Sequence, residues 1–252
     1  MIIKNKVIFV TGACGKIGSS IVNEFLKNEN YVILMDNNEE KLNNFSFNKP
    51  ENYLIYHGNF INKKDLDQCI KKSVERFGKV DVCIHAAYPK SPEWGKNFED
   101  LSIDHLSKDL TNQLGGAIIL SQRFIKFFLY QGFGQIIHIS SIQGVLSPKF
   151  EHYENTNMNS PIEYSAIKSG IISIVKYLAK FYKKKNIRVN CISPGGIFNN
   201  QPELFLEKYK EICNSKGMLE PKDLIGVLSF LISDDSKFIN GQNIIIDDGW
   251  SL

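Results

Sequence analysis

The sequence lacks the features of a membrane protein or an exported protein. No apolar run approaches the ~20 residues that a membrane-spanning helix needs. The first residues lead straight into a strand-like run, without the charged and apolar regions of a signal peptide. We therefore expect a cytoplasmic protein that has no membrane partner.

The sequence also lacks a charge excess and a cysteine pattern. The net charge of +3 over 252 residues is too small to predict nucleic-acid binding. The five cysteines show neither metal-ligand spacing nor an even framework, which indicates reduced thiols and no metal site. Hydrophobic residues make up 43% and charged residues 23% of the chain, which is typical of a globular protein. A single domain spanning residues 1–252 is the simplest reading of this length.

Strand-like and helix-like segments alternate along the chain. The strand-like runs are Val7–Val10, Tyr31–Asp36, Tyr53–Tyr56, Val80–His85, Gln135–Ser140, Ile187–Ser193 and Gln242–Ile246. Helical patterns cover the region after residue 19, residues 63–77, roughly 104–131, about 164–184, and 221–232, while residues 37–48 and 155–159 read as loops. This alternation predicts an α/β fold with a Rossmann-like, doubly wound sheet of seven parallel strands and helices on both faces.

Three glycines follow the first strand-like run, at Gly12, Gly15 and Gly18, and a helical pattern begins directly after them. Glycine permits a tight turn, close approach of the backbone to a pyrophosphate, and packing of helix against strand. The unpaired amides at the start of the helix would face the phosphates. The segment therefore predicts a dinucleotide site.

Asp36 ends the second strand-like run, near the ~20-residue offset expected of an acid that binds an adenosine ribose. A carboxylate there accepts from the ribose hydroxyls and repels a 2′-phosphate, so the sequence favours NAD over NADP. Lys16, a cation within the glycine turn, is the observation that favours NADP.

Tyr164 and Lys168 are four residues apart in a helical pattern and would share one face of that helix. A free phenol has a pKa near ~10, and a neighbouring cation stabilises the phenolate. The pair is therefore typical of a general acid/base, although an exposed i,i+4 pair without chemistry has the same spacing.

These motifs, taken in order, resemble the short-chain dehydrogenase/reductase family over nearly the whole chain. The likeness rests on Thr11–Gly18, His85-Ala-Ala, Gln135–Ser141, Tyr164-Ser-Ala-Ile-Lys168, Arg188–Gly195 and Gly241–Gly249. The segments His85–Trp94, Pro148–Glu151 and Ser193–Glu203 are similar to the branch found in bacterial flagellin-glycosylation and nonulosonic (legionaminic-type) sugar loci.

The resemblance implies a role for each matching residue. Tyr164 would be the general acid/base, Lys168 would bond the nicotinamide ribose and lower the phenol pKa, and Ser141 would hydrogen-bond the substrate oxygen, with Ser140 as its substitute. The implied cofactor contacts are Gly12, Gly15, Ile17 and Gly18 at the pyrophosphate, Asn59 and Phe60 at the adenine, Ala86 and Ala87 at the ribose, and Pro194, Gly195 and Ile197 at the nicotinamide.

The chain departs from the family pattern at several positions. The usual Asn-Asn-Ala-Gly reads His85-Ala-Ala-Tyr88, and the asparagine that supports the proton relay falls at Gln113, with Asn112 adjacent. Residues 148–161 are extra and predict a loop over the cleft. Within it Lys149, His152 and Tyr153 are candidate substrate contacts, as are Lys90 and Trp94 after the fourth strand, although exposed-loop positions explain all five equally well.

Together these observations predict an NAD(P)-dependent oxidoreductase that interconverts a hydroxyl and a carbonyl on a phosphosugar or nucleotide sugar in surface-glycan synthesis. A 3-oxoacyl thioester or small-ketone reductase is one alternative, and a non-catalytic NAD-binding subunit is another, suggested by Gln113. The resemblance also implies a homotetramer or homodimer.

Overall fold

β-Branched and aromatic residues form the strands of a parallel sheet in the computed structural model, which describes residues 2–252. Within these residues the sheet has seven strands in the order β3-β2-β1-β4-β5-β6-β7, all parallel, as predicted. The strands are β1 Val7–Thr11, β2 Tyr31–Asp36, β3 Tyr53–His57, β4 Val82–His85, β5 Gly134–Ile139, β6 Ile187–Pro194 and β7 Asn243–Ile246. The chain order reverses between β1 and β4, where such sheets bind ligands.

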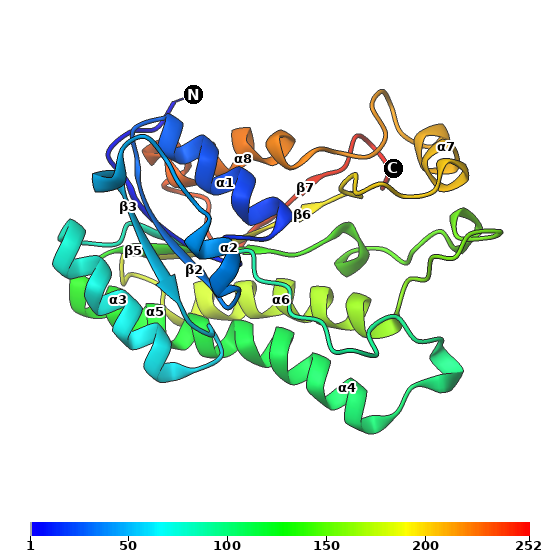
Figure 1. Cartoon of the computed structure of the whole chain (residues 1–252), viewed down its shortest axis with the longest axis horizontal. Helices are drawn as coiled ribbons and strands as arrows, with labels where there is room; N and C mark the ends of the chain where they lie inside the picture. Colours follow the sequence, from blue (N-terminus) through cyan, green and yellow to red (C-terminus); the bar gives the residue numbers. More distant parts are fainter. Residues whose placement is uncertain (1) are drawn as a thin grey trace.

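The helices cover both faces of this sheet (Figure 1). They are α1 Lys16–Lys27, α2 Glu39–Asn43, α3 Lys63–Phe77, α4 Ile103–Asp109, α5 Gly116–Gln131, α6 Ile162–Phe181, α7 Glu203–Glu211 and α8 Ile225–Ile232. Ile8 and Val10 of β1 pack with α1 and α8, whereas Val7 and Phe9 pack with α3, α5 and α6. Successive residues of a strand point to opposite faces of the sheet. The strand β1 therefore contributes side chains to the hydrophobic cores on both faces.

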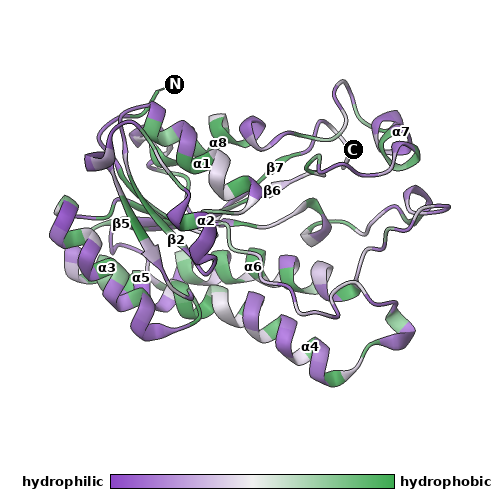
Figure 2. Ribbon diagram, in the orientation of Figure 1, coloured by the Kyte–Doolittle hydropathy of each residue, from purple (hydrophilic) through white to green (hydrophobic). Residues whose placement is uncertain are grey.

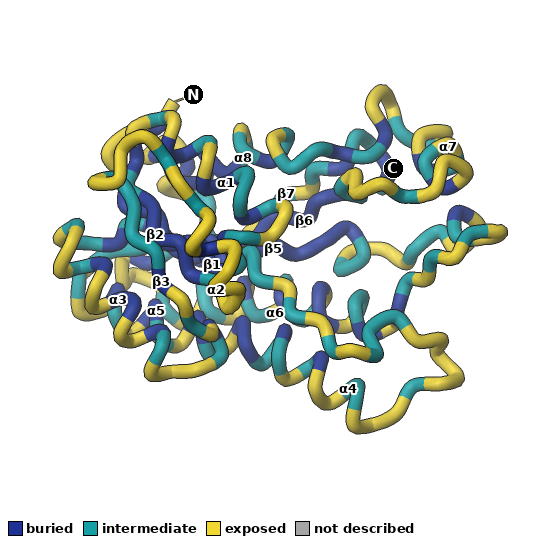
Figure 3. The backbone as a smooth tube through the Cα atoms, in the orientation of Figure 1, coloured by how far each residue is buried: buried dark blue, intermediate teal, exposed yellow. Residues whose placement is uncertain are grey.

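The colouring by hydropathy shows the same division (Figure 2), with apolar residues on the strands and polar ones on the outer surfaces of helices such as α3. The central strands β1, β2, β4, β5 and β6 are largely buried and the edge strands β3 and β7 are mostly intermediate. The segments beyond the sheet on the right of the view are largely intermediate or exposed (Figure 3). Those segments are the loop after β4, the stretch after β5 and the region around α7, which all extend from the same end of the molecule (Figure 1).

The structure corrects several predicted boundaries. The segment 37–48 contains a short helix, α2, because the side chain of Asn38 accepts from the amide of Lys41 at 2.9 Å and caps its start. The helix α7 was not predicted. The helix α6 ends at Phe181 rather than near Lys184, since Lys184 and Asn186 have φ values of 66° and 54°, which a right-handed helix does not allow.

Two predicted helices also differ in their internal structure. Residues Leu110–Gly115 form a π-helical segment between α4 and α5, so the predicted helix over 104–131 is interrupted. The helix that starts at Pro221 begins with a 3₁₀ turn over Pro221–Leu224 before α8. A π-helical turn often marks a functional site, and this one contains Asn112 and Gln113.

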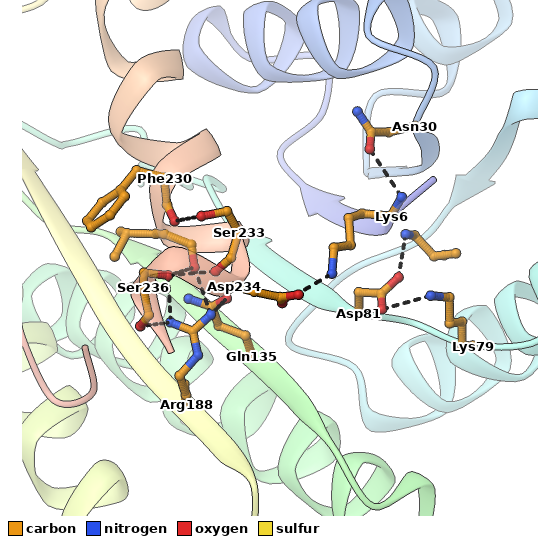
Figure 4. Close-up of polar contacts among 12 residues, drawn as sticks. Lys6, Asn30, Lys79, Asp81, Gln135, Arg188, Phe230, Ser233, Asp234 and Ser236 are labelled. Carbon is orange, nitrogen blue, oxygen red and sulfur yellow. Dashed lines mark hydrogen bonds and ion pairs between the residues drawn. The ribbon is translucent and has the colours of Figure 1, made fainter. Parts of the chain in front are cut away.

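At the amino edge of the sheet, Arg188 of β6 connects two strands to the segment after α8 (Figure 4). Its guanidinium donates to the side chain of Gln135 at 2.8 Å, to the carbonyl of Leu231 at 2.8 Å and to the carbonyl of Ser236 at 3.0 Å. A planar group with several donors suits this position, where several carbonyl oxygens from the end of α8 and the segment after it lie close together.

We expect Arg188→Met to lower the free energy of unfolding by about 3 kcal/mol, since it removes the hydrogen bonds of a part-buried guanidinium and leaves the side-chain oxygen of Gln135 without a donor. Urea unfolding followed by circular dichroism measures the change. Arg123→Met is the matched control, because Arg123 pairs with the exposed carboxylate of Asp67 and should cost no more than ~1 kcal/mol. Equal losses in the two variants would contradict the role of the Arg188 network.

Within residues 2–252, none of the helices combines the length and the hydropathy of a membrane span.

Candidate functional site

The predicted site residues gather at the carboxyl edge of the sheet. Gly12 follows β1, Asp36 ends β2, His85 ends β4 and Pro194 ends β6, while Ser141 lies two residues beyond β5. Parallel strands with these ends at one edge bring the five residues into one region.

A cleft of about 550 Å³ opens at this edge, beside the glycine turn. The predicted cofactor residues that line it are Gly12, Gly15, Lys16, Ile17, Asp36, Asn59, Phe60, Ala86 and Ala87. Cys14, Asn37, Asn38, Lys41, Tyr88 and Asn112 also line it and were not predicted as cofactor contacts. Lys41 comes from α2, which the sequence reading treated as a loop.

Two of the glycines have no room for a side chain. Gly12 has φ of 67°, and a Cβ there would lie 2.5 Å from the Cα of Ala87. A Cβ on Gly18 would lie 2.0 Å from the carbonyl oxygen of Gly12. The turn therefore packs β1, α1 and the end of β4 together at backbone distance, and leaves the start of α1 facing the cleft. This geometry fits a dinucleotide pyrophosphate.

The carboxylate of Asp36 is held in a fixed orientation at the cleft. One oxygen accepts from the amide of Cys14 and the other from the amide of Asn38, each at 2.9 Å. Each oxygen retains a lone pair that can accept from a ribose hydroxyl. The carboxylate therefore suits the ribose-binding role that the sequence predicts for Asp36.

Lys16 reaches across the mouth of the cleft. Its ammonium donates to the side chain of Asn199 at 3.0 Å and lies 5.6 Å from the ring centroid of Phe198. These contacts bring the segment after β6 against the glycine turn. Pro194 and Gly195 lie at the start of that segment, and the amide of Gly195 donates to the carbonyl of Ile246 at 2.8 Å. Ile197 follows and pairs with Leu219.

Ser141, Tyr164 and Lys168 converge from β5 and α6. Ser141 is buried, its hydroxyl accepts from the amide of Gln143 at 3.2 Å, and it lies near enough to Tyr164 to act on the pKa of that phenol. The ammonium of Lys168 lies 5.5 Å from the ring centroid of Tyr164 and donates to the carbonyl of Ile139 at 3.0 Å. Ser140, the predicted substitute for Ser141, instead donates its hydroxyl to the carbonyl of Lys168 at 2.8 Å.

The expectation that Lys168 lowers the pKa of Tyr164 is wrong for the protein alone. Burial raises the pKa of Tyr164, and the nearby Ser141 hydroxyl opposes that rise only in part. Burial also lowers the pKa of Lys168, to about 8. Both shifts share one cause, since desolvation disfavours the charged form of either group.

The π-helical segment separates the two relay candidates. Asn112 lines the cleft, whereas Gln113 is 3% exposed and its side-chain nitrogen has no hydrogen-bond partner within the described residues. An unpaired buried amide is unusual. The sequence count alone did not distinguish these neighbouring positions.

The predicted substrate contacts have different surroundings. Trp94 lies 6.1 Å from the ring of Tyr164, and Lys90 is exposed with its ammonium 4.9 Å from the ring centroid of Tyr88. Tyr153 accepts from the side chain of Gln143 at 3.3 Å.

His152 lies away from the site. It is 4% exposed and packs edge-on against the aromatic rings of Phe205, Tyr209 and Trp250. Lys149 lies over the same cluster, with its ammonium 5.1 Å from the Trp250 ring. The structure therefore gives His152 a packing role, because α7, which the sequence did not reveal, supplies the cluster that buries it.

Tyr88 is the residue that connects the two halves of the site. It lines the cleft, and its ring lies 5.6 Å from the ring of Tyr164 and 5.3 Å from the ammonium of Lys168. The sequence marked this position as a departure from the family glycine and as part of the His85–Trp94 segment, without assigning it a role at the site. The only signal that could have identified it was a large ring where the pattern has none.

No group of three or more His, Cys, Asp or Glu residues in the described part of the chain is arranged to hold a metal ion.

The fold and this site define a Rossmann-type oxidoreductase. Residues 12–251 match the family model described as enoyl-(acyl carrier protein) reductase. The chain is 43% identical to post-translational flagellin modification protein A of Campylobacter coli, over 99% of this chain and 100% of that protein. It is 30% identical to a 3-oxoacyl-(acyl-carrier-protein) reductase of Rickettsia felis, over 97% and 96% of the two chains.

Among solved structures, a short-chain dehydrogenase from Leptospira borgpetersenii with bound NAD+ aligns with a TM-score of 0.88 and 31% identity, covering 99% of this chain and 94% of that one. The chain belongs to the short-chain dehydrogenase/reductase family.

Proposed function

We propose that the protein is an NAD-dependent oxidoreductase that interconverts a hydroxyl and a carbonyl on a phosphosugar or nucleotide sugar in bacterial surface-glycan synthesis. The observation that carries this proposal is the convergence of Ser141, Tyr164 and Lys168. The ring of Tyr88 connects that group to the cleft that the glycine turn and Asp36 line. The similarity to a flagellin modification protein over both full lengths supports the glycan role.

The residues around the cleft fit the dinucleotide. The Gly12–Gly18 turn would hold the pyrophosphate, Asp36 the adenosine ribose, and Lys168 the nicotinamide ribose, with Asn59 and Phe60 near the adenine. The residues Pro194, Gly195 and Ile197 would border the nicotinamide. NAD, when bound there, supplies the hydride acceptor.

Tyr164 and Ser141 perform the proton chemistry in this mechanism. Both hydroxyls would hold the substrate oxygen, and the Tyr164 phenolate would take its proton in the oxidative direction. Because burial raises the pKa of Tyr164, oxidation should accelerate as pH rises. Asn112, which lines the cleft, would support a relay water to solvent, and Gln113 lies behind it.

Lys90, Trp94 and Tyr153 form the proposed substrate side of the site. Lys90 carries the exposed cation suited to a phosphate, and Trp94 and Tyr153 supply aromatic surface near Tyr164. Aromatic surface with a few placed polar groups is typical of small-molecule sites.

A 3-oxoacyl thioester reductase is the second candidate, favoured by the 30% identity to a reductase of that class. The deciding experiment follows absorbance of the reduced cofactor with a panel of sugar phosphates and nucleotide sugars, and with acetoacetyl-CoA. Turnover of a sugar alone supports our proposal, and turnover of the thioester alone replaces it. NADH binding without turnover of either class supports a non-catalytic subunit.

The proposed preference for NAD makes a separate prediction. Asp36→Asn keeps an acceptor oxygen but removes the charge that repels a 2′-phosphate, so the affinity for NADPH relative to NADH should rise on the order of 10-fold. Fluorescence titration with both cofactors measures the ratio. Asp235→Asn, an equal charge change at an exposed position, is the control. An unchanged ratio in Asp36→Asn would remove Asp36 from cofactor selection.

The proposed assembly is a homotetramer or homodimer. Tyr177 and Phe181 on α6 are each 64% exposed, with stacked rings 5.7 Å apart, and Ile118 and Leu129 on α5 are also exposed. Light scattering coupled to gel filtration determines the oligomer.

A further inference from the structure

The ammonium of Lys168 is buried without a carboxylate partner. The side chain is 7% exposed and makes one hydrogen bond, to the carbonyl of Ile139. None of the ion pairs within residues 2–252 includes it. A buried cation requires compensation, since desolvation strongly disfavours the charged form.

Two aromatic rings supply that compensation. The ammonium lies 5.5 Å from the ring centroid of Tyr164 and 5.3 Å from that of Tyr88. Both distances are within the ~6 Å over which a ring quadrupole attracts a cation, and the attraction strengthens where water is excluded. Tyr164 is already the proposed acid/base. Tyr88 stands where the family pattern has glycine, so its ring is the additional one beside Lys168.

The ring of Tyr88 is itself fixed in place. It meets Trp94 edge-to-face at 5.4 Å with an interplanar angle of 86°, and Tyr164 at 5.6 Å with an angle of 65°. Trp94 in turn packs against the cluster that Ala117 of α5 forms with Ile167 and Ile171 of α6. The loop after β4 is therefore anchored to the helix that carries Lys168.

We propose that Tyr88 is a positioning residue whose ring, beside that of Tyr164, holds the Lys168 ammonium in place and keeps it charged. This inference rests on the proposed role of Lys168 in binding the nicotinamide ribose.

The other titratable groups that face Lys168 are neutral, so they do not compensate the charge of its ammonium. His85 of β4 and His138 of β5 are neutral, because burial lowers the pKa of each, that of His138 to about 3. Cys191 of β6 is a neutral thiol, since burial raises its pKa to about 12. Burial likewise raises the pKa values of Tyr88 and Tyr164, so both remain phenols.

Three further charged groups act on Tyr88 rather than on Lys168. Asp109 of α4 and Glu163 of α6 contribute to its raised pKa, and the ammonium of Lys90 lies 4.9 Å from its ring centroid.

The experiment measures NADH affinity by fluorescence from pH 6 to 10. With a Lys168 pKa of about 8, affinity in the wild type should fall as pH rises through that value, because the ammonium is lost. Tyr88→Phe, which keeps the ring, should follow the wild type. Tyr88→Leu, which removes the ring, should show the fall about one pH unit lower.

Two further variants assign the effect. Lys168→Met should weaken binding at every pH and abolish the fall near pH 8. Phe98→Leu removes a 66% exposed ring from the same loop that is not one of the two rings beside the ammonium, so its profile should stay near pH 8. An identical profile in Tyr88→Leu and wild type would overturn the proposal, as would an equal shift in Tyr88→Phe or Phe98→Leu.

A direct titration separates this inference from the proposed function. NMR of protein with ¹³C-labelled lysine gives the Lys168 pKa in the absence of NADH, with Lys168→Met identifying the signal. A value about one unit lower in Tyr88→Leu than in Tyr88→Phe supports the role of Tyr88 even if NADH does not bind, whereas equal values overturn it. Failure of the wild type to bind NADH would overturn the proposed function separately.

Discussion

Replacing Tyr164 by phenylalanine is expected to lower turnover by about 10²–10⁴-fold while NADH binding persists. The phenol is the proposed proton acceptor, and its hydroxyl is the only atom that the substitution removes. The ring that faces the Lys168 ammonium at 5.5 Å remains, so the cofactor end of the site should keep its geometry. Steady-state kinetics with the substrate identified in the sugar panel measures the loss, and NADH fluorescence measures binding.

Tyr177→Phe is the matched control for this prediction. Tyr177 lies on the same helix, α6, but is 64% exposed, so loss of its hydroxyl should leave turnover unchanged. Wild-type turnover in Tyr164→Phe would exclude Tyr164 as the acid/base. A parallel loss of NADH binding would mean that its hydroxyl serves the cofactor site instead.

The second large effect is expected from Gly18→Ala. The new methyl group would lie 2.0 Å from the carbonyl oxygen of Gly12, within the backbone of the turn. Backbone cannot move aside as a flexible side chain can, and overpacking of this kind costs ~1–3 kcal/mol. If the turn shifts to relieve it, NADH affinity should fall about 10- to 100-fold.

Gly226→Ala provides the control for Gly18→Ala. Gly226 lies in α8, and a Cβ there would have no heavy atom within 4 Å. Alanine is favoured over glycine within a helix, so this variant should bind NADH normally and unfold at a slightly higher temperature. Normal NADH binding by Gly18→Ala would show that the turn does not contact the cofactor closely.

The proposed cofactor site was largely predictable because local sequence defines it. The strand that ends at Thr11, the glycines after it and the acid at Asp36 lie within one βαβ unit, and the structure places them around one cleft. The conformation of Gly12 and the close approach to Gly18 explain why the sequence uses glycine there.

The substrate side was less predictable, as His152 and Tyr88 show. His152 lies in a polar-looking loop, yet rings from α7 and the C-terminal segment bury it. Tyr88 lies 76 residues before Tyr164, and nothing local indicates that their rings meet. Such contacts arise only when separate loops fold together.

The sequence by itself determined the parallel sheet, the dinucleotide turn and the spacing of Tyr164 and Lys168, because each depends on short-range periodicity and glycine placement. Only the tertiary structure decided the electrostatics of that pair. Burial raises the pKa of Tyr164 and lowers that of Lys168, the reverse of what an isolated helix pair predicts for the phenol. Desolvation depends on every element packed around a group. The i,i+4 spacing of Tyr164 and Lys168 does not indicate which elements those are.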